Sequence, residues 1–168
     1  TAVPAGDRAA LRIEIKGLKG GHSGIQIGTQ RGNANRLLFR FLREAGKTRE
    51  LLLASVDGGG LRNAIPREAS AVVLVDRAEV AAVEAELAAY EKALAVEFAG
   101  IEDSISAGAA ACDMPAGIID PEVAGKLIRA VIGCPDGVQR MSVAMPGLVQ
   151  TSTNLARVVS DGRTIRLQ

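Results

Sequence analysis

The chain has very few of the residues on which several functional classes depend. Its 168 residues include one histidine, two cysteines, one tyrosine, three phenylalanines and no tryptophan. So few aromatic rings cannot build a base-stacking platform, which needs several exposed rings in register. The 20 lysines and arginines are balanced by 19 acidic residues, for a formal net charge of +1. Because this charge gives no overall attraction to phosphates, we expect neither nucleic acid nor a membrane as a partner.

Cysteines and long hydrophobic runs are also scarce. Cys112 and Cys134 are too few for a four-ligand zinc site, and we expect reduced thiols, as in a cytoplasmic protein. Charged residues interrupt the apolar runs well before the roughly 20 residues that span a bilayer. The chain starts at Thr1 and ends at Gln168 in a strand-like stretch. From this we expect a piece of a longer protein.

The single histidine, His22, restricts the possible chemistry. A zinc site normally uses several His, Cys or carboxylate ligands, and a Ser-His-Asp triad needs its histidine beside a nucleophile. We therefore expect no metal ligands in this chain. If the chain takes part in catalysis, either His22 is central or the reaction is performed elsewhere.

Hydrophobic periodicity predicts an α+β fold over residues 1–106. Strands are expected at 11–16, 50–57, 69–76 and 101–106, and helices at 34–45 and 80–98. The second and third strands are expected to pair antiparallel. This order is the split βαβ plan of a ferredoxin-like βαββαβ sandwich, in which the helices cover one face of an antiparallel sheet.

The remaining residues are predicted to add a partial second α/β unit. Residues 107–117 are small and unpatterned, which indicates a linker or loop. In the segment 118–168 a helix is expected from Pro121, with Asp120 as its N-cap. Asp161-Gly162 then predicts a two-residue hairpin loop between strands at 155–160 and 163–167. The segment 118–168 would either complete the first sheet or form half of a second unit.

Three polar segments are candidates for function. His22 lies among glycines in the segment 20–24, where an unencumbered backbone can present the imidazole to a developing negative charge. The alternative is a loop histidine that bonds only to its own turn. Asn63 offers a bifunctional amide in the connection between two strands, and residues 147–154 form a further polar cluster.

Together these segments resemble the lid, or dimerisation, domain of the dinuclear zinc metallopeptidases, a family that includes the bacterial aminoacyl-histidine (Xaa-His) dipeptidases. The stretches that carry the resemblance are 18–24, 32–38, 61–69 and 147–155. In this family the zinc ligands and the carboxylate that activates water belong to a separate catalytic domain. The resemblance therefore implies two zinc ions in that absent domain, none held by this chain, and no hydrolysis by the chain alone.

The resemblance also implies roles for two residues. The lid histidine of the family stabilises the oxyanion of the tetrahedral intermediate, a catalytic role that falls on His22. The asparagine of the Asn-x-Ile-Pro turn lines the substrate site, which makes Asn63 a substrate-binding residue. No arginine is assigned to the substrate carboxylate, because Arg77, the nearest candidate, starts a helix about one residue out of register.

The resemblance further implies three partners: the parent catalytic domain, a second copy bound through the lid, and a cytoplasmic dipeptide substrate. Two other interpretations stay open. The chain could be the lid of a related aminoacylase or deacylase, or a ferredoxin-like dimerisation module without a catalytic role. A module of that kind needs neither the histidine loop nor the asparagine turn.

Overall fold

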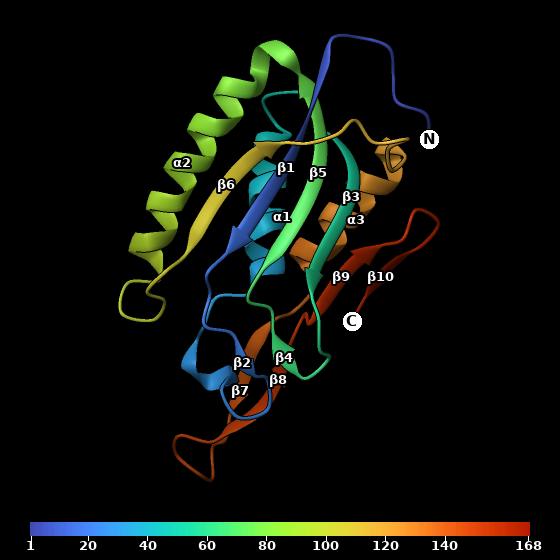
Figure 1. The fold of residues 1–168 in the computed structure, drawn as a ribbon. Helices are drawn as coiled ribbons and strands as arrows, with labels where there is room; N and C mark the ends of the chain where they lie inside the picture. The colour runs from blue at the N-terminus through green and yellow to red at the C-terminus, as the bar shows by residue number, and fades with distance from the viewer.

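Six strands form one antiparallel sheet in the order β10-β9-β3-β5-β1-β6 (Figure 1). The computed structural model describes all residues 1–168. The strands of this sheet are β1 (Arg8–Lys16), β3 (Leu52–Gly59), β5 (Ala69–Asp76), β6 (Ser106–Ala111), β9 (Arg157–Ser160) and β10 (Ile165–Leu167). Two small ribbons pair β2 (Gly21–His22) with β4 (Ala64–Ile65) and β7 (Gly137–Met141) with β8 (Val149–Thr153).

The helices confirm the predicted pattern. They are α1 (Ala34–Ala45), α2 (Val80–Glu97) and α3 (Pro121–Gly133), with short 3-10 turns η1 (Ile27–Thr29) and η2 (Arg77–Glu79). In chain order, β1, α1, β3, β5, α2 and β6 make the βαββαβ unit, and its strands lie in the order β3-β5-β1-β6. The predicted ferredoxin-like sandwich is therefore confirmed. No helix in the structure has the length and apolar character needed to cross a membrane.

The main core lies between the sheet and the three helices. Alternate residues of β1, namely Leu11, Ile13 and Ile15, are buried on this face, as the period of two predicts. Helix α1 contacts both α2 and α3 as well as the sheet. It is therefore buried on more than one side: Leu37, Leu38, Phe41 and Leu42 recur at spacings of three and four, and Phe39, which lies outside that pattern, is also 0% exposed.

The opposite face of the sheet is covered only at one end. A small cluster of Ala10, Leu52, Leu74 and Ile118 is buried there. The N-terminal segment closes over it, because Thr1 and Ile118 exchange hydrogen bonds of 2.9 and 2.8 Å. The helices thus lie on one face of the sheet, and the other face is covered by the chain itself only in part.

The predicted strand at 101–106 is wrong. The turn that follows α2 ends at residue 101, residues 102–105 form no regular structure, and the strand β6 occupies Ser106–Ala111 instead. The predicted linker at 107–117 is therefore wrong for its first five residues. These small side chains show no apolar alternation, so the strand is specified by its pairing with β1 and by Glu91 of α2, which accepts the N–H of Ala107 at 2.8 Å.

The hairpin of β9 and β10 is confirmed, but its predicted two-residue loop is wrong. The loop comprises residues 161–164. The Asp161 carboxylate accepts the backbone N–H groups of Arg163 and Thr164 at 3.0 and 2.7 Å, which favours the longer loop. Strand β9 pairs with β3, so the hairpin adds two strands at that edge of the first sheet. The division into units at 1–106 and 118–168 stays a prediction.

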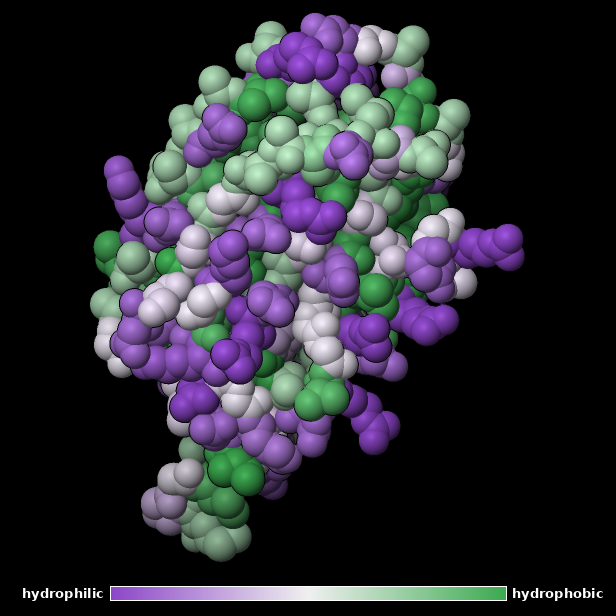
Figure 2. All heavy atoms as spheres, viewed as in Figure 1, coloured by the Kyte–Doolittle hydropathy of each residue, from purple (hydrophilic) through white to green (hydrophobic).

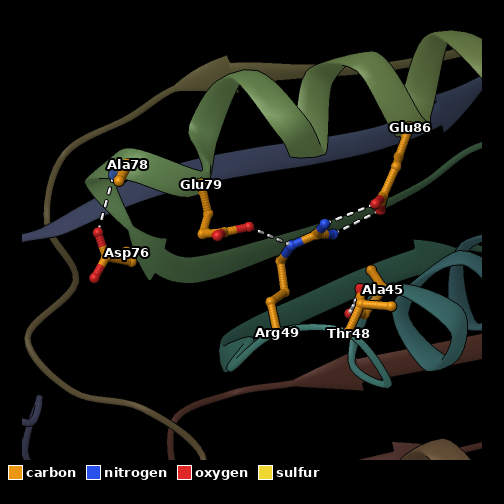
Figure 3. A network of polar contacts seen from close by, with 7 residues as sticks. All are labelled: Ala45, Thr48, Arg49, Asp76, Ala78, Glu79 and Glu86. Atoms are coloured by element: carbon orange, nitrogen blue, oxygen red, sulfur yellow. Dashed lines mark hydrogen bonds and ion pairs between the residues drawn. The ribbon is translucent and has the colours of Figure 1, made fainter.

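An arginine in the connection between α1 and β3 binds two glutamates of η2 and α2 (Figure 3). Arg49 makes two parallel 2.6 Å bonds to Glu86 and a 3.1 Å bond to Glu79. Its side chain is 7% exposed, whereas that of Glu86 is 43% exposed. The hydrogen bond from Arg49 lowers the pKa of the Glu86 carboxyl. This fork fixes α2 over the core with directional bonds in addition to apolar packing.

Candidate functional site

The structure brings His22 and Asn63 together at one end of the sheet. Strand β2 pairs antiparallel with β4, and His22 lies opposite Ala64 (Figure 1). Beside this pair, the N–H of Ser23 donates to the carbonyl oxygen of Asn63 at 2.9 Å. Two segments that are far apart in the sequence therefore form one ribbon.

Two glycines allow the histidine loop to reach this position. Gly20 and Gly21 have φ angles of +60° and +139°, which favour glycine. A Cβ at Gly20 would lie 2.2 Å from the Arg67 side chain, and one at Gly21 would lie 2.4 Å from Gln26 Oε1. The loop can therefore follow its course only with glycine at these positions.

The His22 ring bonds to its own turn on one side only. The N–H of Gly24 donates to His22 Nδ1 at 3.0 Å, and the backbone N–H of His22 donates to Gln26 Oε1 at 2.8 Å. Because Nδ1 accepts, this hydrogen bond assigns the neutral ring proton to Nε2. The imidazole is exposed, so Nε2–H is free to donate to a group outside the chain. The His22 ring can therefore accept the bond from its own turn at Nδ1 and still donate outward from Nε2.

Asn63, in the turn that leads into β4, is also exposed. Its backbone carbonyl holds the ribbon by accepting from Ser23. The side-chain amide is left with both a donor and an acceptor for a ligand. An exposed amide and an exposed imidazole donor on one ribbon suit the recognition of a peptide group.

A buried carboxylate that the sequence did not reveal anchors the histidine loop. Glu102 is 8% exposed and accepts the N–H groups of Lys19 at 2.7 Å and of Gly32 at 3.0 Å, one on each oxygen. It therefore joins the segment before His22 to the segment before α1. The sequence predicts a strand at Glu102 and no functional role for it, because nothing among its neighbours in sequence marks it as buried.

Asparagines form a second anchor below the ribbon. Asn33 caps α1 by accepting from Asn35 N at 3.0 Å, and its Nδ2 donates to Asp136 Oδ1 at 2.9 Å. Asn33 and Asn35 both donate to the carbonyl of Leu155, each at 3.1 Å. The polar cluster at residues 147–154 is visible in the sequence, but its pattern does not show which of its residues contacts the ribbon.

Arg77 does not belong to this site. It lies in η2 beyond the end of β5, beside the start of β1, and its Nε donates to Asp7 Oδ1 at 2.8 Å. His22 follows the other end of β1, so Arg77 and the ribbon lie at opposite ends of the sheet.

The structure contains no group of three or more His, Cys, Asp or Glu side chains that could hold a metal ion. The zinc ions implied by the resemblance do not fit the residues of this chain.

Known proteins share both the sequence and the fold. Residues 13–102 match the peptidase dimerisation domain family. Over 166 residues, 99% of the chain, the sequence is 35% identical to a cytosol non-specific dipeptidase of Escherichia coli (strain K12). The crystal structure of an aminoacylhistidine dipeptidase from Vibrio alginolyticus superposes with a TM-score of 0.95 and 36% identity, again over 99% of the chain.

The chain spans 34% of the length of each of these two relatives. The family match nevertheless covers the second half of β1 and all of α1, β3, β5 and α2, together with the ribbon that carries His22 and Asn63. The chain therefore belongs to the peptidase dimerisation domain family.

Proposed function

We propose that the chain is the lid domain of a cytoplasmic, zinc-dependent aminoacyl-histidine dipeptidase that hydrolyses short Xaa-His peptides. The observation that carries this proposal is the exposed Nε2–H of His22, whose ring is fixed by the bond from Gly24 N. The names and 35–36% identities of the Escherichia and Vibrio relatives support the choice of a dipeptidase. The zinc ions would be held by residues outside 1–168.

In this proposal the two lid residues act on the peptide in different ways. Nε2–H of His22 donates to the oxyanion that develops at the scissile carbonyl, a charge that is present only in the transition state and intermediate. The Asn63 amide binds a polar group of the peptide in both the ground state and the transition state. Loss of His22 should therefore lower kcat, and loss of Asn63 should mainly raise KM.

Exposed apolar side chains support contact between this end of the chain and the rest of a longer protein. The loop that joins β7 to β8 projects from the end that carries β2 and β4, and apolar residues gather at its tip (Figure 2). Val143 is 86% exposed and Met145 is 58% exposed. The relatives contain about three times as much chain. We propose that the catalytic part of the full-length protein covers this tip.

A second copy of the chain is the other proposed partner, bound along β6. This strand is an outer edge of the sheet and, over Ser106–Ala111, carries no charge and no proline. Such an edge is unprotected against pairing with another strand. On this proposal, Ala110→Lys lowers the dimer fraction in analytical ultracentrifugation, whereas Leu167→Lys on the opposite edge does not. Equal effects from both variants would contradict this interface.

Substrate assays of the full-length protein test the proposed activity. We expect cleavage of Xaa-His dipeptides that a zinc chelator abolishes and added zinc restores, and no cleavage by residues 1–168 alone. Faster turnover of N-acyl amino acids than of dipeptides would favour the aminoacylase or deacylase alternative. No hydrolysis of either class would favour a dimerisation module without a catalytic role.

A further inference from the structure

We propose that Asn154 is a positioning residue that holds the β2/β4 ribbon, and with it His22, in the orientation that the reaction requires. The inference concerns a residue of the chain outside the histidine loop and the asparagine turn. It rests on the proposed function for its catalytic consequence, but its structural part can be tested on the chain alone.

The contact that carries the inference is a hydrogen bond across 90 residues of sequence. Asn154 Nδ2 donates to the carbonyl oxygen of Ala64 at 2.8 Å. Ala64 is the residue that lies opposite His22 in the ribbon. The amide of Asn154 therefore fixes the strand that faces the catalytic histidine and that follows Asn63 directly.

The ribbon needs an anchor of this kind because it is very short. Strands β2 and β4 each contain two residues, and even a longer isolated hairpin is only marginally stable in water. Glu102 restrains the loop before His22 through Lys19 N. Asn154 is the corresponding side-chain restraint on the Asn63 strand.

Asn154 is itself rigidly placed. The next residue, Leu155, is 3% exposed, and its N–H donates to Asp136 Oδ1 at 2.7 Å. The Leu155 carbonyl accepts from Asn33 and Asn35 at the start of α1. The main chain of Leu155 is thus held at the start of α1, and the adjacent Asn154 side chain holds the ribbon.

The other end of the Asn154 amide has no partner. Its Oδ1 atom is buried and accepts no hydrogen bond. The reverse orientation of the amide would place Oδ1 against the Ala64 carbonyl oxygen. Because two oxygen acceptors cannot bond to each other, Nδ2 must face the carbonyl. An unpaired buried acceptor is destabilising. The amide is therefore better explained by what Nδ2 holds in place than by its net effect on stability.

The single histidine makes a direct test possible in the 168-residue chain. Its imidazole nitrogen signals in NMR spectra need no assignment among other histidines. We expect Asn154→Ala and Asn154→Asp to change the chemical shifts of Nδ1 and Nε2. Both shifts should move away from the values of a ring that is protonated on Nε2. We also expect exchange of the Gly24 amide, which donates to Nδ1, to become about tenfold faster or more. Thr153→Ala, an exposed neighbour on β8, is the matched control.

Core amides serve as an internal reference in the same experiment. Exchange at Ile13 and Val73, which are fully buried in the sheet, should remain slow, so that a local change is separated from unfolding. Asn154→Asp keeps the side-chain shape while removing the donor, so it tests the hydrogen bond if the alanine variant is too unstable. Unchanged His22 and Gly24 signals in a folded Asn154 variant would overturn the inference.

Kinetics of the full-length enzyme provide the catalytic readout. Asn154→Ala should lower kcat about tenfold to a hundredfold, as expected for a misplaced catalytic group. In a His22→Ala background the same substitution should have little further effect, because there is no imidazole left to position. An equal loss in both backgrounds would show a general structural role and contradict positioning. If the full-length protein hydrolyses no peptide, the proposed function fails while the NMR result still decides the positioning.

Discussion

Ser23 and Asn63 share a main-chain hydrogen bond of 2.9 Å, although one follows β1 and the other follows β3 in the chain. This bond joins the main chain of the histidine loop to that of the asparagine turn, and both His22 and Asn63 are exposed there. The site is therefore a property of the ribbon as a whole, and substitutions that loosen the ribbon should affect both residues together.

The buried Glu102 should contribute more to stability than the acidic residue beside it. Glu102→Gln leaves one acceptor oxygen for the two N–H groups of Lys19 and Gly32, so a buried donor loses its partner. We expect the free energy of unfolding in urea to fall by about 1–3 kcal/mol. Asp103→Asn is the control, because the side chain of Asp103 is 72% exposed in its ion pair with Lys19. A loss of the same size from both variants would contradict the anchoring role of Glu102.

The Arg49–Glu86 fork predicts a dependence of stability on pH. The pKa of Glu86 is lowered by its hydrogen bonds from Arg49. Its stabilisation is therefore complete above the unfolded pKa of about 4.3 and is lost as the pH falls through the lower folded value. Glu86 is 43% exposed, so we expect Glu86→Gln to cost at most about 1 kcal/mol at pH 7.

Chemical denaturation of the Glu86→Gln protein between pH 3 and pH 7 measures this effect. The difference from the unsubstituted chain should shrink toward pH 3. Glu84→Gln on the same helix, an exposed residue, should match the unsubstituted chain throughout. A difference for Glu86→Gln that stays constant with pH would contradict the ion-pair explanation.

The β9–β10 loop should respond only at very low pH. Hydrogen bonds from the Thr164 N–H and hydroxyl, and from the Arg163 N–H, lower the pKa of Asp161 to about 2. The folded pKa lies below the unfolded one, so the loop is stabilised above about pH 4 and loosens as the pH falls toward 2. An NMR titration of the Asp161 carboxyl measures this pKa directly. Thr164→Val should raise it, and an unchanged value in that variant would contradict the assigned cause.

The exposed tip of the β7–β8 loop should matter only in the full-length protein. Val143→Ser with Met145→Ser should leave the melting temperature of residues 1–168 unchanged, because both side chains are already exposed. In the full-length protein the double variant should lower the melting temperature and increase amide exchange at residues 141–148. Val96→Ser on α2, 79% exposed, is the matched control. Unchanged exchange in the full-length variant would contradict coverage by the catalytic part.

Local patterns predicted most of the sheet and all three helices. The alternation of Leu11, Ile13 and Ile15 marks a strand because one face of that strand is buried. Strand β6 was misplaced because its Ser, Gly and Ala side chains carry no such signal. Its position depends on pairing with β1, a contact that no local pattern records.

Some residues of the candidate site can be predicted from local sequence, and others cannot. The glycines around His22 could be interpreted from the sequence, because glycine at a positive φ has a local conformational reason. Glu102 and Asn154 could not, because each acts on a segment distant in sequence, Glu102 on Lys19 N and Asn154 on the Ala64 carbonyl. Their roles depend on burial and partners that only the folded chain provides.

The kinetics of His22→Ala in the full-length protein give the sharpest test, because the proposed oxyanion role assigns one catalytic donor to this chain. We expect kcat to fall by about 10²- to 10³-fold, with unchanged zinc content and a nearly unchanged KM. Ser23→Ala, which keeps the backbone bond to Asn63, should retain activity. Full kcat in His22→Ala with metal bound would contradict the proposed oxyanion role.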